Sequence, residues 1–154
     1  MLTIPFDSLT DYLGITLGHS AWTQISQDRV QAFADATGDQ QWIHVDVARA
    51  RRESPWHSPI AHGFLTLSLL PLLNQQVFRV AGTTASINYG LDRVRFPTAV
   101  MVGAEIRSKV ELLAIRPQGE DRTRASYRST LEVRDQDRPA CVAEHLVLYT
   151  RRSR

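Results

Sequence analysis

An acidic side chain and a histidine lie close together in the sequence, at Asp39 and His44. Asp39 directly follows Gly38, a residue that typically ends a helix, so both groups are expected on one irregular loop. A carboxylate and an imidazole on such a loop can converge on one water molecule, where one group removes a proton and the other delivers one. The pair therefore predicts acid–base chemistry such as the addition of water to a double bond. The spacing alone also fits a turn-forming Asp and a structural His.

The elements on either side of this loop are predicted from helical spacing and capping residues. Hydrophobic residues recur at helical intervals between 26 and 37, with Ser26 as an N-cap and Gly38 as the terminator. A second short helix is predicted over 47–52. These two helices would hold the loop that carries the acidic residue and the histidine.

The most apolar stretch, AHGFLTLSLLPLL at 61–73, places leucines and Phe64 around every side of a helix. A helix that is apolar on all sides is usually buried. Pro71 has no amide hydrogen and should kink or end this helix near Leu70. We therefore expect a buried central helix, followed by a strand over 75–88.

The second half of the chain alternates polar and apolar residues, as strands with one buried face do. Strands are predicted over 104–112, 122–134 and 140–149, with turn-rich breaks between them. A further strand is expected near Thr23. Three strands joined by short turns form an antiparallel meander, and a buried helix before them gives an α+β fold with the helix against the sheet. No linker or repeat divides the chain, so 1–154 is predicted to be a single domain.

The loop also resembles a known sequence motif. Its pattern matches the signature of the (R)-specific enoyl-CoA hydratases at Gly38, Asp39, Ile43, His44 and Ala50, with Phe33 upstream. These enzymes are MaoC-like dehydratases of the hotdog superfamily. The similarity extends over most of the chain, through the segments 58–64, 88–97 and 102–106.

This resemblance implies a hotdog fold, in which an antiparallel sheet wraps around a central buried helix, usually in a homodimer. It implies that Asp39 and His44 form the catalytic acid–base pair for reversible syn hydration of trans-2-enoyl-CoA to (R)-3-hydroxyacyl-CoA. The backbone N–H of Gly63 would hold the thioester oxygen. A helix N-terminus offers free N–H donors and partial positive charge, which suits an oxygen that develops negative charge.

One departure from the family pattern lies inside the loop. The family usually has Asn-Pro before the histidine, whereas this chain has Gln41 and Trp42. Proline restricts the bend and asparagine can tie the loop, so their replacement leaves the loop conformation less defined. Trp42 is interpreted either as a packing replacement or as part of the acyl pocket.

The remaining candidates have less specific roles. His62 could orient the substrate or form a hydrogen bond at the start of the central helix. His57 is expected to be exposed and His145 to be a satisfied core residue. Arg93 and Arg95 are candidates for the nucleotide phosphates of CoA. No pair of histidines has metal-site spacing, so neither a metal nor another cofactor is expected.

The composition argues against several other classes of protein. The net charge is only +2 and the arginines are scattered, so nucleic-acid binding is not predicted. Cys141 is the single cysteine, which excludes an intramolecular disulfide. No window is long and apolar enough for a membrane span, and the first residues do not resemble a signal peptide. A soluble, cytoplasmic protein is therefore expected.

Two alternatives to a hydratase remain from the sequence. A hotdog acyl-CoA thioesterase would use similar substrates, but it gives no reason for the pairing of Asp39 with His44. A non-catalytic acyl-thioester-binding subunit would tolerate the loss of either residue. The expected partners are an acyl-CoA or acyl carrier protein thioester and a second copy of the chain.

Overall fold

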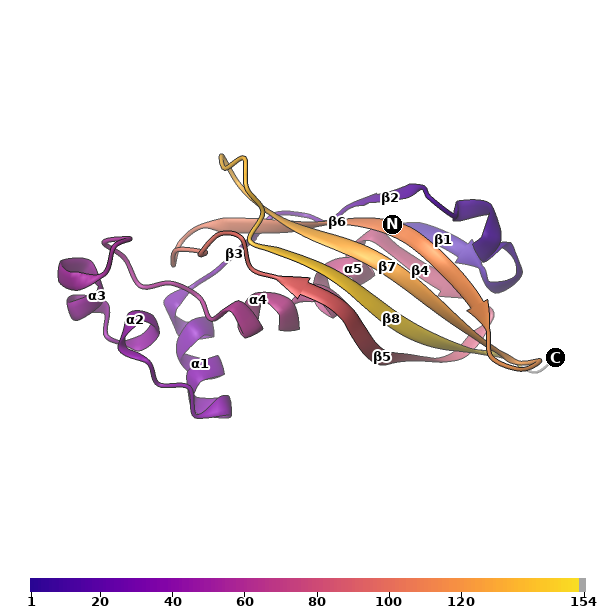
Figure 1. Ribbon diagram of the computed structural model, residues 1–154, viewed down its shortest axis with the longest axis horizontal. Coiled ribbons are helices and arrows are strands. Elements are labelled where there is room, and N and C mark those ends of the chain that lie inside the picture. Colours follow the sequence, from indigo (N-terminus) through magenta and orange to yellow (C-terminus); the bar gives the residue numbers. More distant parts are fainter. Residues whose placement is uncertain (153–154) are drawn as a thin grey trace.

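One long antiparallel sheet forms the body of the molecule and curves around two consecutive helices (Figure 1). The computed structural model describes residues 1–152. In chain order the elements are β1 (Leu2–Pro5), the 3-10 helix η1 (Phe6–Tyr12), β2 (Thr16–His19), β3 (Thr23–Gln24), α1 (Gln27–Thr37), α2 (Trp42–Val45), α3 (Val47–Glu53), α4 (Gly63–Ser68), α5 (Leu70–Val77), β4 (Phe78–Ala81), β5 (Thr83–Arg95), β6 (Glu105–Pro117), β7 (Arg122–Val133) and β8 (Cys141–Arg151).

The strand order of the main sheet confirms the predicted meander. The strands run β2-β6-β7-β8-β5, all antiparallel, and β3 also pairs with β6. Along β7 every second residue is buried, from Ala125 through Tyr127 and Ser129 to Leu131, because one face of the sheet packs on the helices. A separate small sheet is formed by β1 and β4, which pair in parallel. The α+β arrangement with a helix against the sheet is therefore confirmed.

The central helix breaks near Leu70, as predicted, but a second helix follows the break. It is divided at Leu69 into α4 and α5, and Pro71 lies in the first turn of α5. Proline is tolerated there because the first amides of a helix have no intrahelical acceptor. The helix therefore continues to Val77, and the single strand predicted over 75–88 is instead two strands in different sheets, β4 from Phe78 and β5 from Thr83.

The expectation that every side of this helix is buried is wrong. Phe64 is 68% exposed and Leu72 is 48% exposed, while Leu65 and Leu73 lie in the core. The sheet covers one side of α4 and α5 and leaves another side open. Strand β5, at the end of the sheet, also exposes apolar side chains, which we call the β5 edge surface: Ile87, Tyr89 and Leu91.

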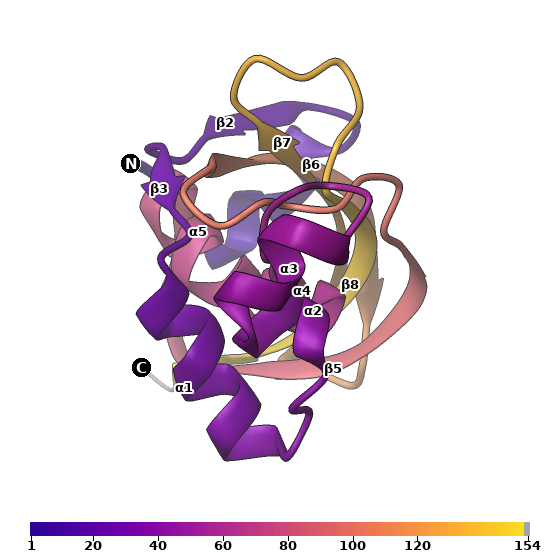
Figure 2. The same ribbon diagram turned by 90° about the vertical axis from the view of Figure 1, so that its left-hand side faces the viewer.

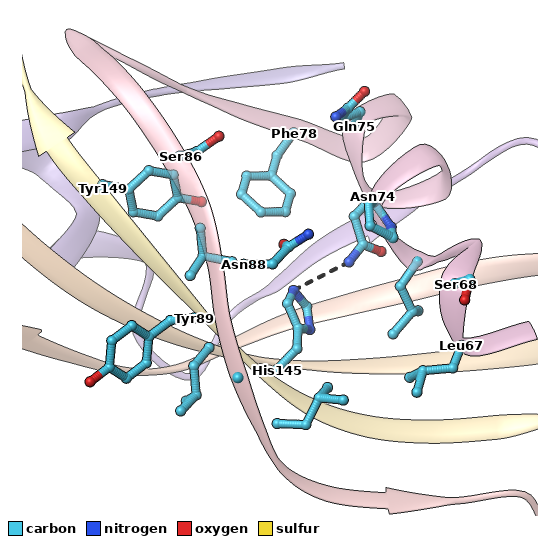
Figure 3. A pocket seen from close by; sticks show the side chains of 16 residues that line it. Leu67, Ser68, Asn74, Gln75, Phe78, Ser86, Asn88, Tyr89, His145 and Tyr149 are labelled. Carbon is cyan, nitrogen blue, oxygen red and sulfur yellow. Dashed lines mark hydrogen bonds between the residues drawn. The ribbon is translucent and has the colours of Figure 1, made fainter. Parts of the chain in front are cut away.

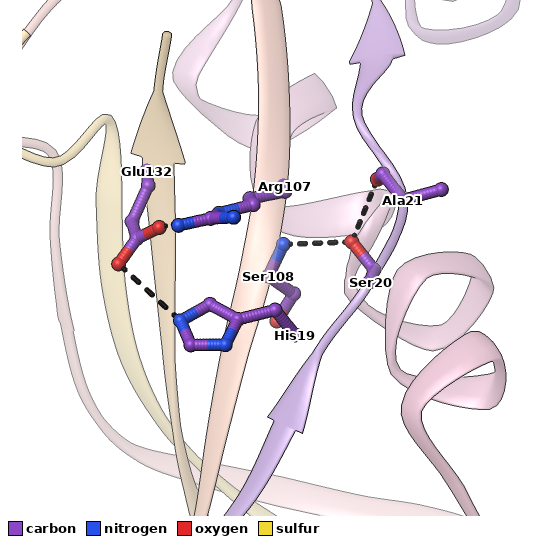
Figure 4. A network of polar contacts seen from close by, with 6 residues as sticks. All are labelled: His19, Ser20, Ala21, Arg107, Ser108 and Glu132. Atoms are coloured by element: carbon purple, nitrogen blue, oxygen red, sulfur yellow. Dashed lines mark hydrogen bonds and ion pairs between the residues drawn. The ribbon is translucent and has the colours of Figure 1, made fainter. Parts of the chain in front are cut away.

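The outer face of the sheet is charged and its strands are linked by ion pairs (Figure 4). Arg107 on β6 contacts Glu132 on β7 at 2.6 Å, and His19 on β2 lies 3.8 Å from the same carboxylate. Beside them, the Ser20 hydroxyl accepts a hydrogen bond from the Ser108 amide at 2.9 Å. Half-exposed pairs of this kind add little stability each. They do, however, give the arginines partners on the protein's own surface.

Helices α1, α2 and α3 lie at one end of the sheet, beyond the N-terminus of α4 (Figures 1 and 2). Ser26 caps α1 by accepting a hydrogen bond from the Arg29 amide, and Gly38 ends it with a φ of 78°. Both predicted boundaries are confirmed, as is the short helix α3. Between residues 1 and 152, none of the helices is long and apolar enough to cross a membrane.

Candidate active site

The loop between α1 and α3 brings its two predicted catalytic residues to different environments. Asp39 follows the left-handed Gly38 and is exposed, with its amide 3.4 Å from the Thr37 hydroxyl. His44 lies in the single turn of α2 and is only 6% exposed. The Gln27 side chain donates to the His44 carbonyl at 2.9 Å, which ties α2 to the start of α1.

The His44 ring is held in one orientation and one tautomer. Its Nδ1 lies 2.7 Å from the backbone carbonyl oxygen of Ile60. A carbonyl can only accept, so Nδ1 carries the hydrogen and Nε2 keeps its lone pair when the ring is neutral. Fixing one nitrogen through a backbone carbonyl leaves the other available for proton transfer.

A second histidine, His62, packs directly against the first. The two rings are stacked with centroids 3.8 Å apart, and the Phe33 ring covers His62 at 5.0 Å. His62 is 2% exposed and its Nε2 donates to the backbone carbonyl of Asp39 at 3.0 Å. It therefore ties the Asp39 loop to the start of α4, which is the hydrogen bond at the helix entry that one interpretation expected. Among residues 1–152, its buried Nδ1 has no hydrogen-bond partner.

These contacts bring the side chains of Asp39, His44 and His62 close together. One side-chain nitrogen or oxygen atom of each lies within 4.8 Å of the corresponding atoms of the other two. Burial lowers the pKa of His44, and proximity to His62 lowers it further, while the Ile60 hydrogen bond and Asp39 act in the opposite direction. His44 is therefore neutral at neutral pH, with a free lone pair beside a carboxylate.

Two histidines and a carboxylate are also the residue types of some zinc sites. A zinc ion lies in the plane of each imidazole that binds it, at about 2.1 Å from the nitrogen. The His44 and His62 rings are stacked 3.8 Å apart with an interplanar angle of 27°, so no point near both rings lies in both ring planes. This geometry does not fit a shared metal ion, and it does fit acid–base chemistry.

A cavity of about 370 Å³ lies beside His44. His44, Gly63 and Thr66 line it from the helices, and Phe96 closes it from the segment after β5. A Cβ atom on Gly63 would come within 3.2 Å of the Phe96 ring, so a larger residue would crowd this wall. Gly63 is the first residue of α4, where amides have no intrahelical acceptor.

Thr66 and Phe96 were missed from the sequence, where nothing distinguishes them from ordinary core residues. Their side chains enter the site only because the end of β5 folds back over the start of α4. Trp56, Thr98 and Ala140 join the same wall from segments far apart in the chain. No local spacing could have indicated that set.

The loop keeps the backbone that the family's Asn-Pro would adopt. Gln41 has φ −58° and ψ 133°, the extended conformation imposed on a residue before proline. Trp42 is the first residue of α2, the helix position that proline favours. The Arg49 guanidinium lies 4.3 Å above the Trp42 ring, and Trp42 is not among the residues that line the cavity. These contacts favour packing over a role in the acyl pocket.

The remaining predicted candidates lie further from the histidine pair. Arg93 and Arg95 are exposed near the end of β5, just before Phe96 enters the cavity wall. Arg95 donates to the neighbouring Val94 carbonyl at 2.7 Å. His57 is exposed, as predicted. His145 lies in β8 as expected, but it lines a different cavity and makes only long contacts there.

The fold and this site define a class of proteins before any relative is considered: a sheet wrapped around a central helix, with an acidic residue and a histidine on an added helical segment. The profile of the MaoC-like domain matches residues 10–133. The chain belongs to the MaoC-like dehydratase family.

Individual relatives agree with this assignment. The chain is 46% identical over 147 residues to 3-hydroxyacyl-thioester dehydratase Z of Mycobacterium tuberculosis, covering 94% of this chain and 97% of that protein. Among solved structures, a MaoC-like dehydratase from Rhodospirillum rubrum is similar with a TM-score of 0.76 at 23% identity, covering 92% and 94% of the two chains. The R-hydratase PhaJ1 from Pseudomonas aeruginosa has a TM-score of 0.68 at 22% identity, covering 92% and 83%. The predicted hotdog fold is confirmed.

Proposed function

We propose that the protein hydrates trans-2-enoyl thioesters reversibly to (R)-3-hydroxyacyl thioesters. The observation that carries this proposal is the meeting of the Asp39 carboxylate with a neutral, tautomer-fixed His44 within 4.8 Å. The names of similar proteins, a 3-hydroxyacyl-thioester dehydratase and an R-hydratase, agree with it.

In this mechanism Asp39 and His44 share one water molecule. One of them removes a proton as the water oxygen bonds to C3, and the electron pair of the double bond moves toward the thioester carbonyl. That proton, held by the Asp39–His44 pair, is then delivered to C2, which restores the thioester and returns both groups to their starting protonation states. Because both groups act from one side, the hydroxyl and the hydrogen add to the same face.

The negative charge that develops on the thioester oxygen is stabilised by a hydrogen-bond donor. The backbone N–H of Gly63 is our candidate, because it lies at the start of α4 in the wall of the cavity beside His44. A preorganised N–H aimed at a developing oxyanion contributes on the order of 3 kcal/mol to lowering the barrier. His62 positions Asp39 through its hydrogen bond to the Asp39 backbone carbonyl.

The carrier of the acyl group is proposed to be CoA. Arg93 and Arg95 are exposed next to the Phe96 wall, where their guanidinium groups can meet nucleotide phosphates. An acyl carrier protein would place its own acidic surface on the same arginines. Competition between crotonyl-CoA and free CoA, with and without Arg95→Gln, tests the CoA assignment.

A second copy of the chain is proposed as the structural partner. Strand β5 ends the sheet, and within the described part of the chain it pairs only with β8. An unpaired edge with exposed Ile87, Tyr89 and Leu91 needs cover in water. A homodimer through the β5 edge surface would extend the sheet across both copies. Light scattering that finds an active 17.4 kDa monomer would contradict it.

The function is tested with crotonyl-CoA as substrate. Hydration removes the absorbance of the conjugated enone and leaves the thioester intact, whereas a thioesterase releases free thiol. We expect loss of absorbance without thiol, and near-complete loss of this activity in Asp39→Asn at an unchanged melting temperature. Asn serves a turn as well as Asp does but cannot exchange a proton. A folded Asp39→Asn protein with full turnover would make Asp39 structural and favour a non-catalytic role for the loop.

A further inference from the structure

The two proposed catalytic side chains are held in different ways. The His44 ring is fixed by its own hydrogen bond to the Ile60 carbonyl. Among residues 1–152, the Asp39 carboxylate accepts no hydrogen bond. Asp39 is held only through its backbone, by His62 at its carbonyl and by a long 3.4 Å contact from its amide to the Thr37 hydroxyl. An acid–base group must stay within hydrogen-bond reach of its proton, so catalysis depends on how the backbone of this loop is anchored.

Asn74, a buried polar residue of α5, shows what direct anchoring looks like in this fold. Its amide nitrogen donates to the Ser129 hydroxyl at 3.0 Å, and its oxygen accepts from the Ser108 hydroxyl at 2.7 Å. The same amide lies 3.4 Å from His145 (Figure 3). Hydrogen bonds of this kind orient a side chain directly. The Asp39 carboxylate has none within the described part of the chain, and its orientation therefore follows from the loop.

Gln40, the residue after Asp39, connects the loop to α1. Its side-chain amide donates to Oδ1 of Asp35 at 2.9 Å. Gln31, one turn earlier in α1, donates to the same oxygen at 2.9 Å and so orients the carboxylate that Gln40 meets. The hydrogen bonds from Gln40 and from Gln31 lower the pKa of the Asp35 carboxyl, which is therefore ionised at neutral pH. Hydrogen bonds to an ionised acceptor are stronger than those to a neutral one.

This bond completes the anchoring of Asp39 on both sides. Before it, the Gly38 amide donates to a carbonyl of α1 at 2.8 Å and closes that helix. After it, Gln40 is bonded to Asp35. In the segment 38–41 of the described chain, Gln40 is the one residue whose side chain makes a hydrogen bond. The Gln40–Asp35 bond is therefore the side-chain restraint that the loop itself supplies.

The bond occurs beside the position where the sequence departs from the family's Asn-Pro. A proline at position 42 would fix the φ of that residue without any side-chain hydrogen bond. The backbone accommodates one, because Gln41 is extended and Trp42 is the first residue of α2. Between residues 1 and 152, the Trp42 amide also has no hydrogen-bond acceptor that a proline would cost it. The chain thus lacks a restraint that its loop conformation would accept.

We propose that Asp35 is a positioning residue for the hydration reaction. Through Gln40 it holds the loop so that the Asp39 carboxylate stays close to His44, a restraint that proline would otherwise supply. This inference rests on the proposed function. Asp35 and Gln40 are both exposed, so their bond adds little to global stability, and its loss should act on the loop and on the rate.

The first test measures kcat, KM and the melting temperature of the intact protein with crotonyl-CoA as substrate. In Asp35→Ala we expect kcat to fall about three- to tenfold, with KM changed less than about twofold, because one hydrogen bond that positions the loop is lost. Asp35→Asn keeps an oxygen that accepts from Gln40 and should retain at least about half of kcat. Asp28→Ala, at another exposed aspartate of α1, is the matched control and should keep the wild-type kcat.

The second test asks whether proline replaces the bond. In a protein that carries Gln41→Asn and Trp42→Pro, adding Asp35→Ala should change kcat less than about twofold, because the backbone is already restrained. The same substitution in the wild-type background should give the larger fall. A residue that only stabilises α1 would cost the same in both backgrounds. The comparison therefore separates positioning of the loop from a general loss of stability.

Hydrogen–deuterium exchange of the amides of residues 39–41 reports the restraint without turnover. Exchange should be faster in Asp35→Ala than in the wild type, and slower again when Trp42→Pro is added. Unchanged kcat and exchange in Asp35→Ala, equal losses in Asp35→Ala and Asp35→Asn, or a fall of equal size in the proline background would each overturn the inference. A wild type that does not hydrate crotonyl-CoA would instead contradict the proposed function, and with it the catalytic role of Asp35, whatever the exchange rates are.

Discussion

The buried His44 and the partly buried His145 differ in the contacts that suit a histidine to proton transfer. Burial lowers the pKa of both. His44 is fixed by a 2.7 Å bond to the Ile60 carbonyl and lies near a carboxylate. His145 has contacts of 3.4 and 3.5 Å and an Asn as its neighbour. A lowered pKa is therefore common to both, and the fixed tautomer with a nearby Asp distinguishes the histidine suited to proton transfer.

The largest effect that would sharpen this comparison is expected from His44→Ala. Loss of a positioned acid–base group typically costs 10²- to 10⁴-fold, so kcat/KM for crotonyl-CoA should fall by at least about 10²-fold. Adding Asp39→Asn should cost little more, because in the proposed mechanism the two groups act on one water molecule. His57→Asn, at an exposed histidine with a φ of 50°, is the matched control and should retain activity. Multiplicative losses in the double variant would show that the two residues act independently.

His145 should produce the next largest effect, on stability. Its pKa is about 4 in the folded protein, against 6.5 for an ordinary histidine. The unfolded chain therefore binds the proton first as the pH falls, and stability that is present above pH 6.5 is lost progressively toward pH 4. The maximum loss is roughly 3 kcal/mol at about 1.4 kcal/mol per pKa unit.

Urea unfolding of the wild type and of His145→Phe at pH 7 and pH 4 measures the contribution of His145 to the pH dependence of stability. The fall in unfolding free energy between the two pH values should be smaller in the variant, because phenylalanine has no proton to take up. Carboxylates and His44 titrate in both proteins, so the difference between them isolates His145. An equal fall in both would show that the His145 ring is already well solvated.

A smaller effect is expected from His62→Phe, which keeps a stacked ring but removes the hydrogen bond to the Asp39 carbonyl. We expect kcat/KM to fall about tenfold, the cost of loosening one net hydrogen bond that positions the loop. Burial is the main cause of the lowered His44 pKa and His62 adds to it, so the variant should also move the His44 limb of the pH–rate profile to higher pH. A lower rate with an unmoved profile would mean that His62 only stabilises the fold.

Local chemistry explains why much of the helical segment could be predicted from the sequence. Ser26 and Gly38 specify the ends of α1 through their own side chain and backbone, whatever surrounds them. The alternation of polar and apolar residues likewise predicted the strands β6, β7 and β8. Pro71 correctly indicated a break near Leu70, but the chain continues as α5 because proline also fits the first turn of a helix.

The site could be predicted only in part, for a related reason. The spacing of Asp39 and His44 indicated a shared loop, and the family resemblance raised it to a catalytic pair. The bond from His62 to the Asp39 carbonyl and the meeting of Asn74 with His145 join residues far apart in the sequence. Contacts of this kind depend on how the sheet curves around α4 and α5, which no local pattern encodes.

The smallest effect is expected at Trp42, the residue that replaces the family's proline. Its ring stacks under Arg49 outside the cavity, so Trp42→Leu should lose about 1 kcal/mol of cation–π and packing energy and lower the melting temperature by about 2–4 °C. The turnover of crotonyl-CoA should change less than about threefold, since Gln41 and α2 hold the backbone near His44. Trp22, whose ring contacts the guanidinium groups of Arg107 and Arg134, offers the matched control Trp22→Leu. If both tryptophans only pack, the two variants should lose similar stability at similar turnover. A large fall in kcat for Trp42→Leu alone, at an unchanged melting temperature, would place this ring in the chemistry and show that the loop depends on it beyond packing.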